Sequence, residues 1–202
     1  LTVSKTLGGG IPLAGVITSD AIEETCHARG FAFYTSHVSD PLPATVGLAV
    51  LDTIVEEDLL QRSRELGDYL AASLRTLQQR HEEIGDVRGM GLLRGIELVK
   101  DRETREPYHE LGALTTQQCL ELGLSMNIRR RPERGSVWRI APPLTVARED
   151  IDLAMTIFDQ ALTEMKAVVA RRPGTLDTST RKPHAVAAPA PQRLRLRARV
   201  NS

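Results

Sequence analysis

Lys5 is the residue whose surroundings most clearly suggest chemistry. The stretch before it alternates apolar and polar side chains, with Leu1 and Val3 as the apolar positions, which is typical of a short β-strand. Three glycines, at positions 8–10, follow closely, so a ligand could approach the backbone beside the amine without meeting side chains. A lysine in such a place can condense with a carbonyl compound to form a Schiff base. A surface lysine ahead of a glycine-rich turn explains the same residues.

Arg139 is the second candidate. It belongs to a short strand that we predict over residues 137–140, directly before Pro142 and Pro143. A guanidinium at this place could hold a substrate carboxylate through two parallel hydrogen bonds. An arginine in an ordinary salt bridge at a strand edge is the alternative.

A third group of candidates lies in a polar segment closed by prolines. Ser36, Val38 and Asp40 offer a hydroxyl, a backbone carbonyl and a carboxylate within five residues, and such oxygen ligands suit a hard cation. The alternative is a helix cap formed by Ser39 and Asp40. We interpret His37, which lies among them, as a structural residue.

Four stretches together resemble the class III aminotransferases, which use pyridoxal phosphate. SKTLGGG at residues 4–10 is similar to the lysine segment shared by that family. YTSHVSDPLP at 34–43, GLSMNI at 123–128 and RIAPPLT at 139–145 resemble its 2,2-dialkylglycine decarboxylase branch. The resemblance runs in register from residue 1 to about residue 162.

This resemblance implies a role for each candidate. Lys5 would bind pyridoxal phosphate as a Schiff base and move protons, and Arg139 would bind the substrate carboxylate. Ser36 replaces a threonine that contacts the cofactor phosphate of the neighbouring subunit. Ser36, Val38 and Asp40 would bind an alkali-metal ion, potassium or sodium.

The implied reaction is a decarboxylating transamination. A 2,2-dialkylglycine and pyruvate would give a ketone, carbon dioxide and alanine, and the full-length protein would be a homodimer or homotetramer. Two other functions remain open: an ordinary class III aminotransferase with another amine donor, and an inactive remnant or interaction domain. We expect a cytoplasmic protein that acts on small amino and keto acids, without a membrane or nucleic-acid partner.

The implied architecture is α/β, the C-terminal part of a fold-type I pyridoxal-phosphate-dependent transferase. Residues 1–55 would end the large domain, 56–82 would form a long linking helix, and 83–168 a small α+β domain. Hydrophobic periodicity agrees with this division. It predicts strands at the start of the chain and at 13–18, 92–99, 124–128 and 137–140, and helices near 20–29, 44–55, 56–82, 111–122 and 151–165. The helix at 44–55 is apolar on most sides, so we expect it to be buried.

Composition adds general limits. The chain has 202 residues, of which 41% are hydrophobic and 26% are charged with both signs present, a composition that fits a globular protein; its formal net charge is zero. Residues 171–202 hold eight Lys or Arg and one Asp, so the remainder is acidic by about seven charges, and we expect 169–202 to be a disordered basic tail. The two cysteines suggest a reducing compartment. The aspartate, phosphate loop and stacking ring that the family uses for its cofactor would precede Leu1, so the chain alone should bind the cofactor weakly.

Overall fold

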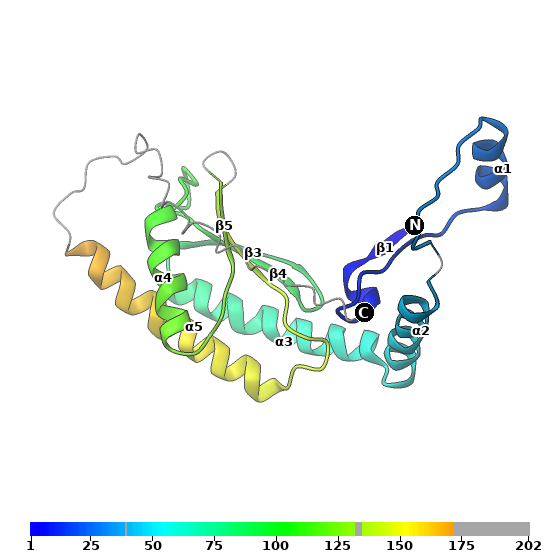
Figure 1. The fold of residues 1–202 in the computed structure, drawn as a ribbon. Coiled ribbons are helices and arrows are strands. Elements are labelled where there is room, and N and C mark those ends of the chain that lie inside the picture. The colour runs from blue at the N-terminus through cyan, green and yellow to red at the C-terminus, as the bar shows by residue number, and fades with distance from the viewer. Residues whose placement is uncertain (39, 132–134, 172–202) are drawn as a thin grey trace, which may run out of the picture.

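The computed structural model describes residues 1–38, 40–131 and 135–171. The tail expected at 169–202 therefore lies almost wholly outside the described residues. The chain forms two units that are joined by two consecutive helices, α2 (Pro41–Glu56) and α3 (Leu59–Arg80) (Figure 1). The candidate residues are divided between the two units.

The N-terminal unit contains a two-stranded antiparallel sheet. Strand β1 (Thr2–Ser4) pairs with β2 (Ala14–Val16), and the 3-10 helix η1 (Lys5–Gly8) lies between them. Helix α1 (Asp20–Ala28) follows, and the chain turns after it at Gly30, where φ is 76°. These elements agree with the strands and the short helix that the sequence predicts.

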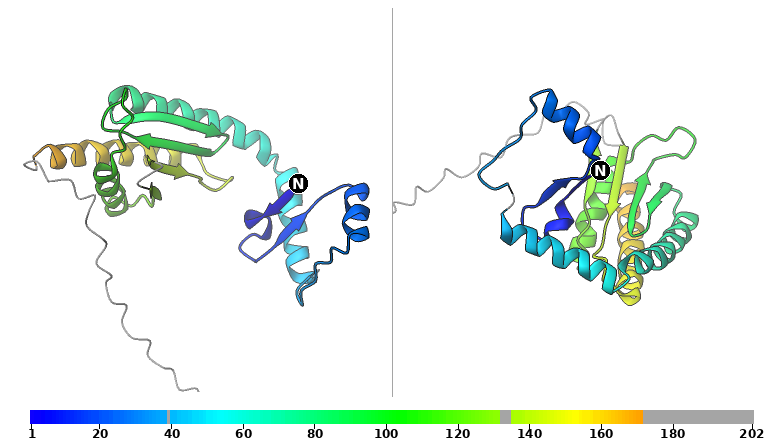
Figure 2. Two further views of the ribbon diagram at one scale, coloured as in Figure 1. Left: turned by 90° about the horizontal axis from the view of Figure 1, so that it is seen from above. Right: turned by 90° about the vertical axis from the view of Figure 1, so that its right-hand side faces the viewer.

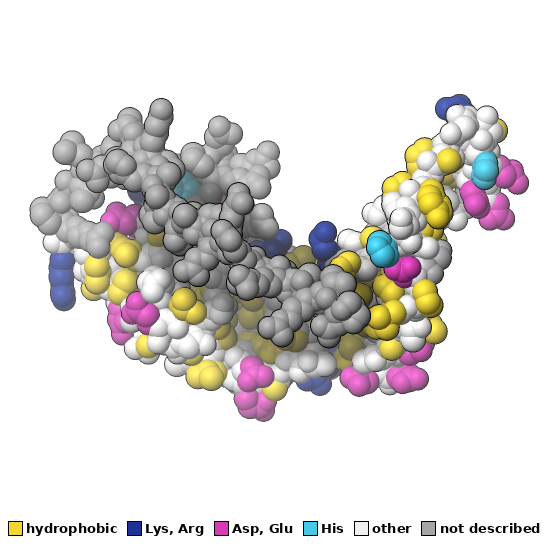
Figure 3. Space-filling view, viewed as in Figure 1, with side chains coloured by type: hydrophobic (Ala, Val, Ile, Leu, Met, Phe, Trp, Pro, Cys, Tyr) yellow, Lys and Arg dark blue, Asp and Glu magenta, His cyan; other side chains and the backbone are white. Residues whose placement is uncertain are grey.

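Helix α2 begins earlier than predicted, at Pro41, because a proline fits the first turn of a helix without losing a hydrogen bond. The prediction that this helix is buried is wrong for this chain. Leu48 is 59% exposed and Val55 77% exposed, and Figure 3 shows hydrophobic side chains over this part of the surface. Helix α2 packs mainly against η1 and the start of α3, so most of its apolar surface has no cover within the described residues.

Helix α3 is shorter than the single helix predicted over 56–82. Asp58 adopts a left-handed backbone conformation, with φ at 46°, and this residue separates α2 from α3. The apolar stripe of α3 is buried, as its periodicity predicts, through Leu70, Leu74 and Leu77.

The C-terminal unit is built on a four-stranded antiparallel sheet. Its order is β3 (Ile84–Met90), β4 (Leu93–Leu98), β6 (Gly135–Ile140) and β5 (Ile128–Arg131). Helix α3, helix α4 (His109–Glu121) and helix α5 (Arg148–Ala170) pack on one face of the sheet, and the views in Figure 2 show this layer of helices. The other face we call the open face. Because strands alternate their side chains, each strand contributes to both faces.

Two strands differ from the prediction. β3 was not predicted, because Gly85, Asp86 and Gly89 interrupt its apolar pattern and a bulge lies between Ile84 and Asp86. The strand predicted at 124–128 is wrong: residues 124–127 form no strand, and β5 begins only at Ile128. This segment lines a pocket, and the Asn127 carbonyl accepts a hydrogen bond from the backbone N–H of Arg139 at 3.3 Å.

The cysteines are free thiols. Cys119 is buried in the core of the C-terminal unit and Cys26 is half-buried in the N-terminal unit. Helices long and apolar enough to cross a membrane do not occur in the described part of the chain.

Candidate active-site residues

Lys5 lies at the first position of η1 with its backbone in the left-handed region, at φ 64°. Such a conformation costs an L-residue other than glycine roughly 1–2 kcal/mol. The side chain is exposed. Lys100 and Lys166 both form ion pairs, whereas the Lys5 amine has no hydrogen bond or ion pair with any described residue. The turn therefore presents a free amine at a strained backbone position.

The turn that carries Lys5 is seated closely on α2. A Cβ added at Gly47 of α2 would lie 2.5 Å from Cδ2 of Leu13, so a larger residue there would push the Leu13 side chain aside. Leu13 belongs to the segment 11–14, which forms a hollow of about 490 Å³ together with Ser4 and Lys5. The free amine thus borders a space into which a carbonyl compound could enter.

A second hollow, of about 850 Å³, shares the segment 11–14 with the first. Val38 and Asp40 line it, but Ser36 does not. Asp40 Oδ2 is 2.8 Å from His37 Nδ1, and the Asp40 side chain makes no cap hydrogen bond to α2. The three proposed metal ligands are therefore close in sequence, but only Val38 and Asp40 of the three face the same hollow. In the described part of the chain no cluster of three or more His, Cys, Asp or Glu could hold a metal ion.

Arg139 is positioned by its neighbour Trp138. The indole of Trp138 is fully buried, meets the ring of Phe158 edge to face at 4.9 Å, and donates a hydrogen bond from Nε1 to Thr116 Oγ1 at 2.8 Å. This contact fixes β6 against α4 and α5. Because side chains alternate along a strand, Arg139 must then lie on the open face.

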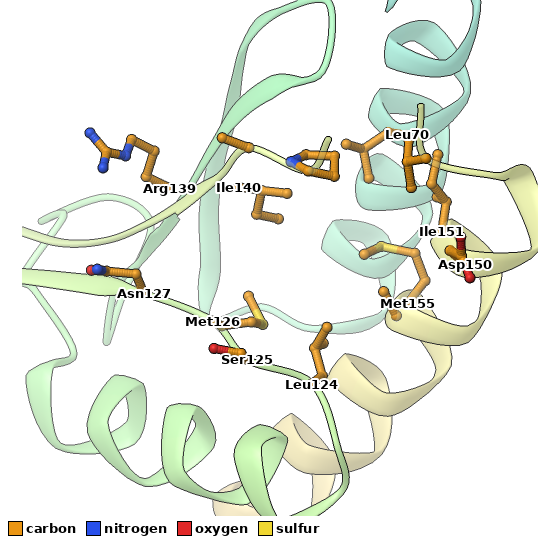
Figure 4. Close-up of a pocket in the computed structure, with 14 residues that line it drawn as sticks. Leu70, Leu124, Ser125, Met126, Asn127, Arg139, Ile140, Asp150, Ile151 and Met155 are labelled. Carbon is orange, nitrogen blue, oxygen red and sulfur yellow. The ribbon is translucent and has the colours of Figure 1, made fainter. Parts of the chain in front are cut away.

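The Arg139 side chain is exposed and borders two hollows. One, of about 460 Å³, is largely apolar and lies between β6, the segment 124–127 and α5. The other, of about 480 Å³, lies on the open face over Gly95. Figure 4 shows the guanidinium pointing away from Leu70 and Met155, which line the first hollow. Within the residues that the structure describes, this guanidinium forms no ion pair, so the salt-bridge alternative does not hold there.

Lys5 and Arg139 are not brought together. They belong to different units and line different hollows. Sequence reasoning also missed features that matter for both sites. The left-handed backbone of Lys5 leaves no trace in residue type, and Arg88, which shares the open face with Arg139, lies in the unpredicted strand β3.

Comparisons with known proteins give a consistent result. The family model described as aminotransferase class-III matches residues 1–162. An uncharacterized aminotransferase of Schizosaccharomyces pombe is 47% identical over 163 residues, which cover 81% of this chain and 36% of that protein. A leucine/methionine racemase of Thermococcus litoralis is 36% identical over 166 residues, covering 82% and 36% respectively.

Solved structures agree. A Bacillus anthracis aminotransferase superposes with a TM-score of 0.75 at 29% identity, over 81% of this chain and 38% of that one. An Arthrobacter phospholyase in complex with phosphoethanolamine gives 0.72 at 29% identity, over 80% and 38%. The chain spans roughly a third of the length of the curated relatives that it matches. It belongs to the class III aminotransferases, a family that depends on pyridoxal phosphate.

Proposed function

We propose that this chain supplies the covalent anchor and the carboxylate-binding group of a pyridoxal-phosphate-dependent aminotransferase. The observation that carries the proposal is Lys5, an exposed amine with no partner among the described residues, held on a strained turn beside a hollow. Its ε-amine would hold the cofactor covalently. When bound, pyridoxal phosphate supplies the electron sink for charge that develops at the substrate. Released from that bond, Lys5 Nζ would move a proton to and from the substrate, a contribution of about 10²–10⁴-fold for a positioned acid–base group.

Arg139 would bind the carboxylate of the amino acid. Its guanidinium lies over an open hollow without a competing carboxylate partner in the described residues, so two parallel hydrogen bonds to a substrate carboxylate are available. Since Lys5 and Arg139 lie on separate units, one substrate would meet both groups only where the two units, or two subunits, enclose it. We therefore include a homodimer or homotetramer in the proposal, with Ser36 contacting the cofactor phosphate of the neighbouring subunit.

The alkali-metal site fits the structure less well. Asp40 already bonds to His37, and Ser36 does not border the hollow that Val38 and Asp40 line. This arrangement does not offer a three-ligand site, so no step of the proposed reaction uses an ion.

For the amine donor, we propose a 2,2-dialkylglycine, with pyruvate as the acceptor of the amino group. The support is the likeness of residues 34–43 and 139–145 to the decarboxylating branch of the family. The second candidate is ordinary transamination from another donor, which the names of the relatives favour, since they include aminotransferases and a racemase.

One pair of donors tests both proposals on the full-length protein with pyridoxal phosphate. 2-Aminoisobutyrate and isopropylamine differ only by a carboxylate, and carbon dioxide and alanine are measured with pyruvate present. We expect carbon dioxide from 2-aminoisobutyrate, whereas alanine without gas from other amino acids would favour the second candidate. In Arg139→Met we expect kcat/KM for 2-aminoisobutyrate to fall about 10- to 100-fold, as for a lost charged hydrogen bond, with isopropylamine unaffected. Equal losses for both donors would remove Arg139 from the proposal.

A further inference from the structure

The open face of the sheet places Arg88 and Arg139 in one row. Arg88 of β3 lies opposite Gly95 of β4, and Gly95 lies opposite Arg139 of β6. The next row contains Asp86, Glu97 and Val137 in the same order of strands. The face therefore carries two cations and two carboxylates on adjacent rows.

Arg88 binds both carboxylates. Its Nη1 atom is 2.6 Å from Asp86 Oδ2 and 2.7 Å from Glu97 Oε2. These hydrogen bonds, first the one to Asp86 and then the one to Glu97, raise the pKa of the Arg88 guanidinium above its ordinary value. One nitrogen of Arg88 is thus the shared donor to the two acidic groups.

Glu97 is the carboxylate that could compete for Arg139. Because Gly95 pairs with Arg139 and Val137 pairs with Glu97, the two charged residues are diagonal neighbours on adjacent strands. Diagonal neighbours lie about 7–8 Å apart at Cα, which is within reach of long side chains. Asp86 belongs to the next strand out, so it lies farther from Arg139.

Gly95 keeps the space between the arginines open. A Cβ there would meet Val137 Cγ1 at 3.6 Å and Arg88 Cγ at 3.7 Å, so the position has room that no side chain fills. The hollow of about 480 Å³ lies over it, bordered by Arg88 and Arg139. An incoming carboxylate could therefore reach Arg139 as long as Glu97 stays with Arg88.

We infer that Arg88 is a positioning residue for the carboxylate site: by holding Glu97, it keeps the Arg139 guanidinium free for the substrate carboxylate. The inference rests on the proposed role of Arg139. Arg88 itself does not contact the substrate in this scheme. Its effect is to keep the Glu97 carboxylate away from Arg139. Substituting Arg88 should therefore weaken binding of the substrate carboxylate, and a second substitution that removes the Glu97 charge should restore it.

The test titrates this chain with pyruvate at constant ionic strength and follows the guanidinium Nε–H signal of Arg139 by NMR, assigned with Arg139→Lys. In Arg88→Leu we expect Glu97 to turn to Arg139 and the apparent Kd for pyruvate to rise about two- to fivefold, the range of an exposed ion pair. In Arg88→Leu/Glu97→Gln we expect the wild-type Kd. The matched control is Arg88→Leu/Asp86→Asn, which removes the more distant carboxylate and should keep the raised Kd.

The outcomes distinguish the proposed role of Arg139 in carboxylate binding from the inferred role of Arg88. No response of Arg139 to pyruvate in the wild-type chain would overturn the proposed function, and the inference with it. If Arg139 responds to pyruvate in the wild-type chain but the Kd is unchanged in Arg88→Leu, the inference alone is overturned. It is also overturned if adding Asp86→Asn to Arg88→Leu restores the wild-type Kd as fully as adding Glu97→Gln does. If Arg88→Leu does not fold, Arg88→Lys keeps a cation but loses the planar fork. A smaller rise in Kd that Glu97→Gln reverses supports the inference, and no rise refutes it.

Discussion

Two adjacent threonines of α4 should have opposite effects on stability. Thr116 Oγ1 accepts the hydrogen bond from the buried Trp138 Nε1–H and donates one to the Gly112 carbonyl. Thr115 is fully buried, and its hydroxyl has no hydrogen-bond partner within the part of the chain that the structure describes. Valine has nearly the same shape and helix propensity as threonine, so Thr→Val at either position tests the hydroxyl alone.

The magnitudes follow from what each hydroxyl does. Thr116→Val leaves the Trp138 N–H buried without an acceptor, which costs about 1–3 kcal/mol in the free energy of unfolding. Thr115→Val replaces an unsatisfied buried hydroxyl with a methyl group and should raise the free energy of unfolding by about 1 kcal/mol. The two variants should therefore differ by about 2–4 kcal/mol, although they alter neighbouring residues of one helix.

Urea denaturation measures both effects. Trp138 is the only tryptophan, so its fluorescence reports on the C-terminal unit, and far-UV circular dichroism provides a second probe. We expect the midpoint to fall for Thr116→Val and to rise for Thr115→Val at an unchanged slope. Equal destabilisation by both substitutions would refute the reasoning, because it would show that the Thr115 hydroxyl is satisfied.

Two further predictions concern titrating groups in the C-terminal unit. Burial raises the pKa of the Cys119 thiol to about 12, so a thiol reagent at pH 8 should modify only Cys26 in the native chain and both thiols in denaturant; two fast thiols in the native chain would contradict the burial. Burial alone would raise the pKa of Asp159, but hydrogen bonds from His81 and Arg80 more than offset it and hold the pKa below its ordinary value. That carboxylate therefore stabilises the fold above a pH of about 4, the unfolded value, and its contribution is lost as the pH falls through the folded pKa. In Asp159→Asn the acid side of the stability profile should be shallower, and an unchanged acid side would contradict this role.

The sequence predicts the periodic elements of this fold well. Helices α3, α4 and α5 bury apolar stripes that recur every three or four residues, and such a pattern requires no knowledge of the partners. The alternation that puts Trp138 inward and Arg139 outward is readable in the same way. The main failures concern context. Strand β3 is held by pairing with β4, although Gly85 and Gly89 weaken its own propensity. Helix α2 is apolar on most sides and yet exposed, because burial depends on what packs against a helix and not on its composition alone.

In the candidate site, too, the residues could be predicted from the sequence but their surroundings could not. Lys5, Arg139 and Asp40 are recognisable from the motifs around them. Their environments are not, because the left-handed backbone of Lys5 and the His37–Asp40 contact arise from three-dimensional structure. The link between Arg88 and Glu97 depends on strand register, because a shift of one residue would turn the side chains of the strand to the other face of the sheet.

The most direct test of the account is the site at which pyridoxal phosphate attaches to this chain. The chain is incubated with the cofactor, reduced with borohydride, digested and mapped by mass spectrometry. We expect the added mass on Lys5, with Lys100 and Lys166 as internal controls because both are ion-paired, and we expect none at that peptide in Lys5→Ala. Labelling of Lys100 or Lys166 to the same extent as Lys5 would contradict the central claim.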